Sequence, residues 1–186
     1  MKLSIKKRST DKKCQSNRLR REGHIPAVLY VRGKESLSIS VAQSEFDSIL
    51  RSLVKGRLST TIFTLVDEKG QEKKAIVKDI QHHPTSYKIL HLDFEELHPD
   101  VPVNVKVPIE CTGVIECAGI KLGGVLRRVI RFLRVNCLPE DIPNHFDLDV
   151  RELSIKQYKR LADLTIPEKV RPLANLDEVA VVIAKR

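Results

Sequence analysis

The chain contains few aromatic residues and no tryptophan. Its 186 residues include three tyrosines and five phenylalanines, which together make 4% of the sequence. Proteins that hold single-stranded nucleic acid on a row of stacked rings need more aromatic side chains than this. If the partner is a nucleic acid, recognition must therefore depend on charge, shape and hydrogen bonds.

Long apolar runs are also absent. Nowhere do eighteen apolar residues follow one another, and charged residues begin at Lys2, so the N-terminus lacks the apolar stretch of a secretory signal peptide. A chain of this length with 41% hydrophobic residues can bury one good core or two small ones, and typical domain sizes favour two. We expect a soluble, cytoplasmic, folded protein without a membrane contact.

The sequence lacks the patterns that hold metals or carry out catalysis. No Cys-x-x-Cys pair occurs among the four cysteines, which are Cys14, Cys111, Cys117 and Cys137. Because His82 and His83 are adjacent, they point to opposite faces of a strand and cannot both ligate one ion without a bulge. There is no nucleophile elbow, phosphate-binding glycine loop or metalloprotease histidine pair. The sequence therefore predicts a non-catalytic protein with no cofactor, metal or small-molecule substrate.

What the chain does have is a strongly basic first segment. Residues 1–34 contain eleven lysines and arginines against two acids, which accounts for the whole net charge of +9. The rest of the chain is balanced, with 22 bases and 22 acids. Lysine and arginine release counterions when they dock on phosphates, so this asymmetry is typical of a segment that binds nucleic acid. Nucleic acid is therefore the leading candidate partner.

The first 95 residues show mainly the two-residue periodicity of strands. Polar and apolar residues alternate in four segments, and Pro26 precedes a further apolar strand. The expected strands are 27–30, 37–41, 61–66, 75–80 and 89–94, with a hairpin turn at 67–70. Helical spacing occurs at 15–22, which Gly23 ends, and at 43–53, where Ser44 is a candidate N-cap. We expect a mostly β fold in which residues 1–95 form a small β-barrel or curled sheet with two helices.

Residues 96–186 form the second expected domain, which is also mainly β. They carry 14 bases and 13 acids, so protein contacts or scaffolding suit them better than a main nucleic-acid contact. The segment 101–109 alternates but contains two prolines, which predict a sheet edge or a strand that joins two sheets. The segment 125–135 predicts an apolar strand with arginines on its margin. Further expected elements are strands at 146–150, 164–166 and 179–184 and a helix at 154–161.

Several fragments, taken in order, carry a family resemblance. In the first half these are Ser16-Asn17-Arg18-Leu19-Arg20-Arg21-Glu22-Gly23-His24-Ile25-Pro26-Ala27-Val28-Leu29-Tyr30, then residues 79–84 and 89–94. In the second half they are residues 107–109, 123–126, 137–143 and 178–182. With this order and spacing the chain resembles, over nearly its whole length, the long two-domain form of the bacterial large-subunit ribosomal proteins that bind 5S rRNA, the L twenty-five or Ctc family.

The resemblance implies a ribosome-associated protein whose N-terminal β-barrel sits on an internal loop of 5S rRNA and whose second domain is mainly β. Other ribosomal proteins are then candidate partners of the second domain. At position 17 many members carry arginine, so Asn17 predicts one phosphate contact fewer. By matching positions, the resemblance implies phosphate and groove contacts from Lys13, Arg18, Arg20 and Arg21, hydrogen bonds from Ser16 and Tyr30, and discrimination by Gln81, His91 and Asp93.

Two other classes of function remain open at this stage. The first is a protein–protein adaptor or stress-response factor in which residues 96–186 are the functional half. The second is a nucleic-acid-processing enzyme that uses Cys14, the one thiol in a basic setting, or the His82-His83 pair. Removing residues 96–186 separates the first alternative from an RNA-binding protein, and substituting Cys14 or the histidines tests the second.

Overall fold

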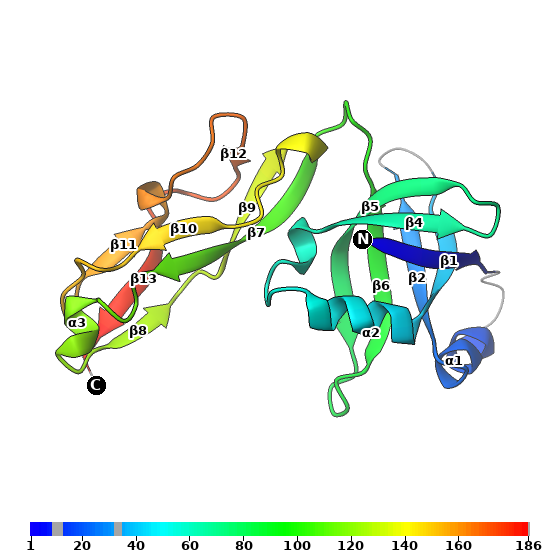
Figure 1. The fold of residues 1–186 in the computed structure, drawn as a ribbon, viewed down its shortest axis with the longest axis horizontal. Helices are drawn as coiled ribbons and strands as arrows, with labels where there is room; N and C mark the ends of the chain where they lie inside the picture. The colour runs from blue at the N-terminus through cyan, green and yellow to red at the C-terminus, as the bar shows by residue number, and fades with distance from the viewer. Residues whose placement is uncertain (9–12, 32–34, 186) are drawn as a thin grey trace. The chain divides into compact units, whose positions relative to one another are not determined.

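The computed structural model describes residues 1–8, 13–31 and 35–185, without the side chain of Lys13. The chain divides into two compact units, residues 1–101 and residues 102–186. Strands predominate in both (Figure 1), which confirms the mostly β fold. In the described part of the chain, no helix is both long and apolar enough to cross a membrane.

The first unit is a barrel of six strands with two α-helices and one short 3-10 turn among its described residues. Its elements are β1 (Lys2–Lys7), α1 (Lys13–Arg21), β2 (His24–Tyr30), β3 (Leu37–Ala42), α2 (Gln43–Ser52), η1 (Leu58–Thr60), β4 (Ile62–Asp67), β5 (Glu72–His82) and β6 (Ile89–Glu96). All five expected strands of this half are present, and the expected hairpin joins β4 to β5, where Gly70 adopts a φ of 76°.

The barrel is closed by two parallel pairings between strands far apart in the sequence. The strand order is β1-β3-β2-β6-β5-β4, and β1 returns to pair with β4. In that last pairing Leu3 lies opposite Leu65, and in the other parallel pair, β2 with β6, Leu29 lies opposite Phe94. Closure leaves the barrel without a free strand edge. Of the two sequence alternatives, a small barrel or a curled sheet, the barrel is confirmed.

Alternating side chains fill the barrel interior. Three phenylalanines form its centre, since the Phe63 ring stacks on Phe46 at a centroid distance of 6.3 Å and meets Phe94 edge to face at 6.1 Å. All three are fully buried. Phe46 comes from α2, so this helix covers the interior with its apolar side. Its expected N-cap at Ser44 is wrong, because α2 begins directly after Ala42, where β3 ends, and no side chain caps it.

The second unit consists of two small sheets with one short helix. Its elements are β7 (Val103–Thr112), α3 (Ala118–Lys121), β8 (Val125–Arg128), β9 (Phe132–Cys137), η2 (Pro139–Asp141), β10 (Phe146–Asp149), β11 (Tyr158–Arg160), η3 (Leu161–Asp163), β12 (Arg171–Pro172) and β13 (Val179–Ala184). One sheet has the order β10-β7-β9-β12 and the other the order β11-β13-β8. Gly119 and Gly124 are required where α3 meets this second sheet, because a Cβ on either would lie within 3 Å of Ile183.

Three expectations for the second unit are corrected. The segment 125–135 is not one strand, because β8 and β9 belong to different sheets. The predicted helix at 154–161 is a turn followed by β11, since Tyr158 and its neighbours pair with β13. Residues 164–166 form no strand. The proline-containing strand, β7, is interior in its sheet, but each half has a different partner: β9 pairs along 103–108 and β10 along 109–112.

Candidate nucleic-acid interface

Helix α1 presents three of the four described arginines of the basic segment, and the fourth is Arg8. Arg18, Arg20 and Arg21 all lie in its last turn, where positive charge also complements the helix dipole. Gly23, with a φ of 79°, ends the helix and lets the chain enter β2 directly. Arg18 and Arg21 are exposed, and Arg20 is partly buried. The helix therefore directs two guanidinium groups into solvent and one against the barrel.

Arg20 joins α1 to the barrel. Its Nε and Nη2 both donate to the carbonyl oxygen of Leu90, each at 3.1 Å. Its Nη1 donates to Oδ1 of Asn17 at 3.0 Å, within the same helix. Because Leu90 precedes His91 on β6, the bidentate contact holds the helix beside the start of the strand that carries the polar residues. Asn17 thus has a structural role that its sequence position did not reveal.

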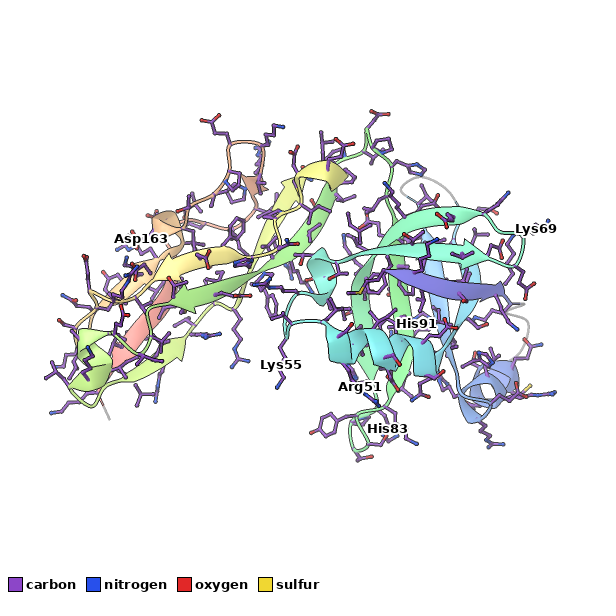
Figure 2. The ribbon with its side chains drawn as sticks, viewed as in Figure 1. Arg51, Lys55, Lys69, His83, His91 and Asp163 are labelled. Atoms are coloured by element: carbon purple, nitrogen blue, oxygen red, sulfur yellow. The ribbon has the colours of Figure 1, made fainter. Side chains whose placement is uncertain are left out.

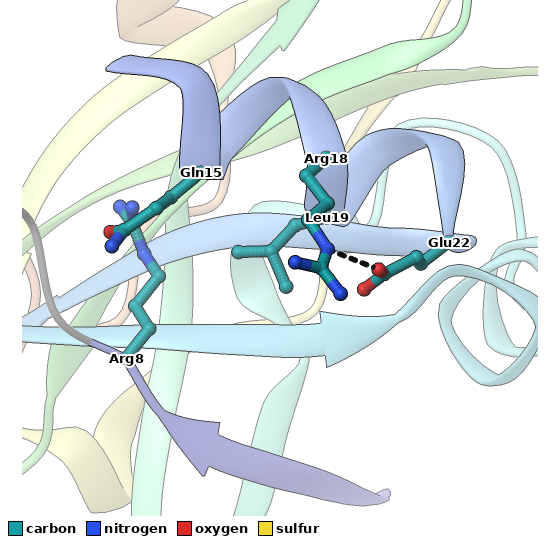
Figure 3. A pocket seen from close by; sticks show the side chains of 5 residues that line it. All are labelled: Arg8, Gln15, Arg18, Leu19 and Glu22. Atoms are coloured by element: carbon teal, nitrogen blue, oxygen red, sulfur yellow. Dashed lines mark hydrogen bonds and ion pairs between the residues drawn. The ribbon is translucent and has the colours of Figure 1, made fainter. Parts of the chain in front are cut away.

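A shallow hollow of about 300 Å³ lies between the end of β1 and α1, lined by Arg8, Gln15, Arg18, Leu19 and Glu22 (Figure 3). Arg8 donates through Nε to the carbonyl of Ile39 at 3.0 Å and through Nη1 to Ser16 Oγ at 3.4 Å. Partial burial, and second the nearby Arg20 guanidinium, lower the pKa of Arg8 below its ordinary value. Two neighbouring cations that repel each other favour an anion between or above them.

Arg18 is partly neutralised within the helix. Its Nε donates to Oε1 of Glu22 at 2.7 Å, four residues further on (Figure 3). This hydrogen bond, and then the carboxylate charge, raise the pKa of Arg18. Arg21 makes no hydrogen bond or ion pair with any described residue and is exposed. Arg21 is therefore the arginine of α1 with all its donors available, while Arg18 shares one with Glu22.

Polar residues on β5 and β6 form the second part of the site. In the antiparallel register Gln81 lies opposite His91 and Asp79 lies opposite Asp93. His91 Nδ1 and Asp93 Oδ1 are 2.7 Å apart, which confirms that the two share one face of the strand. Figure 2 shows His91 on β6, within the barrel unit. Leu92 and Phe94, which alternate with these residues, fill the core. The strand therefore points its polar side chains outward because its apolar ones must point inward.

Tyr30 borders the same strand from β2, where it pairs with Glu95. Partial burial raises the pKa of its hydroxyl to about 12, and the charges of Glu95, Asp93 and Asp79 act in the same direction. The hydroxyl is therefore a hydrogen-bond donor throughout the neutral range. Glu95 is ion-paired with Lys78, so Asp79 and Asp93 are the carboxylates of this face that would repel a phosphate group. This part of the site therefore favours ligand atoms that donate hydrogen bonds.

The nine residues predicted for the site fall into two groups. Ser16, Arg18, Arg20 and Arg21 lie on α1, whereas Tyr30, Gln81, His91 and Asp93 lie on the outer face of β2, β5 and β6, and Arg20 links the groups through Leu90. Lys13 begins α1, but its side chain lies outside the described residues. Sequence reasoning did not single out Arg8, Asp79 or Glu95, and it considered Asn17 only as a lost phosphate contact. Of these, Asp79 and Glu95 could have been found, because each lies two residues from a predicted site residue on the same strand.

The residues considered for metal binding or catalysis have structural roles or stand alone. His82 Nδ1 is 3.1 Å from the carbonyl of Tyr87, and His83 Nδ1 accepts from the backbone amides of Thr85 and Ser86, so both histidines shape the turn between β5 and β6. Cys14 is exposed on α1. Across the described ranges, no three His, Cys, Asp or Glu side chains gather closely enough to hold a metal ion.

Comparison with known proteins accounts for the whole chain. Residues 3–94 match the model of the Ribosomal L25p family, and residues 102–186 match that of the ribosomal protein TL5 C-terminal domain. A protein of Chlamydia abortus is 49% identical over 186 residues, one of Chlamydia trachomatis serovar L2 is 48% identical and one of Chlamydia muridarum is 46% identical, in each case over the full length of both chains. Each of these relatives is named large ribosomal subunit protein bL25. The chain therefore belongs to the bL25 family of large ribosomal subunit proteins, whose role is structural and not enzymatic.

Proposed function

We propose that the protein binds 5S rRNA through the first unit and so helps to build the large ribosomal subunit. Lys13, Arg18, Arg20 and Arg21 contact phosphates, Ser16 and Tyr30 add hydrogen bonds, and Gln81, His91 and Asp93 read base edges. The observation that carries this proposal is the double hydrogen bond from Arg20 to the Leu90 carbonyl, which fixes the basic helix beside His91. A phosphate-binding element and a base-reading element are thereby held in one arrangement.

The charges of the first unit support an affinity that falls with salt. Arg18 and Arg21 are exposed at the end of α1, within the segment that carries the whole net charge of +9. If about five phosphates are neutralised, log affinity should fall against log salt with a slope of roughly −3.5 to −4.5. A slope near zero would contradict the electrostatic part of the proposal.

The carboxylates support base recognition beside this phosphate contact. Asp93 accepts from the His91 ring, and its second oxygen can accept from an amino group at the edge of a base. The minor groove of A-form RNA is shallow and exposes base edges and 2′-hydroxyls. An internal loop widens the helix further and makes the base edges more accessible to a side chain such as Asp93. Asp79 and Asp93 would repel a backbone at the same position, so in this proposal β6 faces bases and α1 faces phosphates.

The test is a titration of the full chain against 5S rRNA and against an unrelated hairpin RNA of equal length. We expect tighter binding to 5S rRNA. Arg18→Ala should weaken binding to both RNAs, whereas His91→Ala should reduce the preference for 5S rRNA. Lys69→Ala is the control, because it removes one exposed charge from the β4–β5 hairpin, away from the proposed contacts. Equal affinity for both RNAs would reduce the first unit to a general phosphate clamp and overturn the proposal.

A further inference from the structure

The loop that joins β5 to β6 carries the most exposed aromatic ring of the chain. This loop comprises residues 83–88 and extends past α2 at one end of the barrel (Figure 1), where Figure 2 shows His83. Of the eight aromatic side chains, Tyr87 is the most exposed, at 78%, followed by Tyr158 at 50% and Phe132 at 43%. The ring of Tyr87 is therefore accessible to a partner.

The backbone of Tyr87 has a conformation that tyrosine rarely adopts. Its φ is 55°, in the left-handed region, where Cβ lies close to the following carbonyl oxygen and glycine or asparagine is the usual residue. The ring does not offset this cost, because it lies mostly in solvent and makes no hydrogen bond or ring contact with a described residue. Such strain persists where the surrounding structure imposes it, and it is typical of positions that bind a ligand.

Hydrogen bonds within the loop impose this conformation. The backbone N–H of Tyr87 donates to the His83 carbonyl at 2.9 Å, and the Tyr87 carbonyl is 3.1 Å from His82 Nδ1. On the other side of the loop, His83 Nδ1 accepts from the backbone amide of Ser86 at 3.3 Å. Both backbone polar groups of Tyr87 are thus held, while its ring projects into solvent. A ring that is positioned in advance loses little freedom when it binds.

The loop directly continues the strand pair that the proposed RNA site uses. Gln81 lies opposite His91, and the next pair, His82 with Ile89, lies at the start of the loop. Tyr87 precedes His91 by four positions, so their Cα atoms are at most about 14 Å apart. An RNA whose bases reach His91 therefore also comes close to Tyr87.

The chemistry of the loop favours a base over a protein partner. Residues 82–90 include two histidines and one lysine but no acid, so no carboxylate of this stretch repels a nucleic acid. The centre of a protein interface collects several apolar side chains. Tyr87 is the one exposed large apolar residue between His82 and His91, a stretch that the structure describes in full. A single ring on a polar loop suits the π-face of an unpaired base.

We propose that Tyr87 stacks on an unpaired base of the RNA that the first unit binds. The inference rests on the proposed function and adds to it a contact that carries no charge. Bases in the internal loops of RNA can leave the helix and stack on aromatic side chains, which paired bases cannot do. Tyr87 therefore favours an RNA with an internal loop over a perfectly paired duplex. The low aromatic content excludes a row of stacked rings, but not this single one.

The test is a titration of the full chain and of Tyr87→Asn with 5S rRNA over a range of salt concentrations. Asparagine tolerates the left-handed conformation but has no ring. We expect the affinity of Tyr87→Asn to be about tenfold lower, as for the loss of one stacked base. The factor should be the same at every salt concentration, because stacking releases no counterions. Tyr87→Phe, which restores a ring, should recover most of the lost affinity.

Stability separates a binding role of the ring from a structural one. Because asparagine relieves part of the strain, Tyr87→Asn should unfold at a urea concentration equal to or above that of the original chain. A lower urea midpoint would show that the ring stabilises the fold, and it would overturn the proposal. Tyr158→Leu is the matched control, since it removes the second most exposed ring, on β11 of the other unit. Equal losses of affinity in both variants would also overturn the proposal.

A tryptophan at position 87 gives a direct signal of stacking. The chain has no tryptophan, so Tyr87→Trp places a single one in the loop. Stacking on a base should quench its fluorescence when 5S rRNA is added. Fluorescence that saturating 5S rRNA leaves unchanged would contradict the proposal.

The outcomes distinguish failure of this proposal from failure of the 5S rRNA proposal. If the original chain prefers 5S rRNA to an unrelated hairpin RNA and Tyr87→Asn binds 5S rRNA equally well, stacking is overturned and the 5S rRNA proposal stands. If the original chain shows no preference but Tyr87→Asn binds both RNAs more weakly, stacking is supported and the 5S rRNA proposal fails.

Discussion

The two units solve the same problem, how to bury one face of a β-sheet, in different ways. The first closes its six strands into a barrel around Phe46, Phe63 and Phe94, whereas the second leaves two small sheets open. Because the barrel is closed, no strand presents a row of unpaired backbone N–H and C=O groups, and the outer surface is made by side chains. In the described part of the second unit, β10 and β12 are the edges of one sheet and β11 and β8 are the edges of the other.

The two units also differ in how their charged residues are distributed. The first unit gathers its excess charge in one segment of the sequence, where a simple count finds it. The second is close to neutral, with 14 bases and 13 acids over residues 96–186, and one sheet face carries Lys106 and Arg134 together with Glu110 and Asp147. The excess positive charge of the first unit is therefore local in the sequence, whereas the second unit mixes both signs on one face.

The largest expected effect is a loss of stability in one unit that leaves the other unit unchanged. Phe63→Ala removes the ring that contacts both Phe46 and Phe94, and truncation of a fully buried phenylalanine costs about 3–5 kcal/mol. We expect residues 1–101 to unfold at lower urea concentration while signals from residues 102–186 keep their transition. The matched variant Leu133→Ala, in the core of the second unit, should show the reverse. A single transition that moves in both variants would show that the units unfold as one.

A smaller effect is expected where α1 joins the barrel. Arg20→Lys keeps the positive charge but cannot donate to the Leu90 carbonyl from two nitrogens. Docking of α1 should weaken by about 1–2 kcal/mol, and amide exchange in residues 14–21 should become faster. RNA affinity should fall although charge is retained. Unchanged exchange would mean that α1 is held by its other contacts with β2.

Glu22→Gln tests whether Glu22, an acid within the basic segment, lowers the RNA affinity of that segment. The change frees Arg18 from its ion pair and removes a negative charge near the bound phosphates. We expect RNA affinity to rise about twofold at low salt and the gain to disappear at high salt. Glu68→Gln, an exposed acid in the β4–β5 hairpin, is the control and should have no effect. A loss of affinity in Glu22→Gln would mean that Glu22 positions Arg18 for binding.

The smallest expected effect concerns pH and the closure of the barrel. Asp67, at the end of β4, pairs with Lys7 of β1, and this contact holds the pKa of its carboxyl below its ordinary value. A lowered folded-state pKa adds stability that is complete above the unfolded value and is lost as the pH falls through the folded one. Asp67→Asn should therefore be less stable than the original chain at pH 6, and the difference should shrink and disappear as the pH falls through the lowered pKa of Asp67. Urea unfolding over a series of acidic pH values measures it.

The sequence predicted elements well where local patterns determine them. Alternation, with the apolar run after Pro26, identified five of the six barrel strands but not β1, and helical spacing identified α2, which is one residue shorter than expected. The errors arise where a distant partner decides the structure. Tyr158 to Arg160 form a strand because β13 is beside them, and the arginine-rich segment is divided because its two ends pair with different strands.

The same distinction applies to the site. A spacing of two placed His91 and Asp93 on one face, and the structure confirms their contact. The anchoring of Arg20 could not be predicted, because its acceptor is a backbone carbonyl 70 residues further along the chain. Backbone acceptors are the same in every residue, so nothing in the side chain of Leu90 marks this position. The RNA contacts of all nine predicted residues stay predictions.

The parallel pairings of the barrel determine when the proposed RNA site can exist during synthesis. Strand β1 is made first, but its partner β4 ends at Asp67, and β2 pairs with β6, which ends at Glu96. Such long-range pairings form late, because loops of many residues must close before any contact compensates for the lost entropy. The Leu90 carbonyl that holds Arg20 is part of this last strand. A nascent chain therefore displays its positive charge long before it has the geometry to discriminate one RNA from another, and selective binding begins only when β6 has left the ribosome that made it.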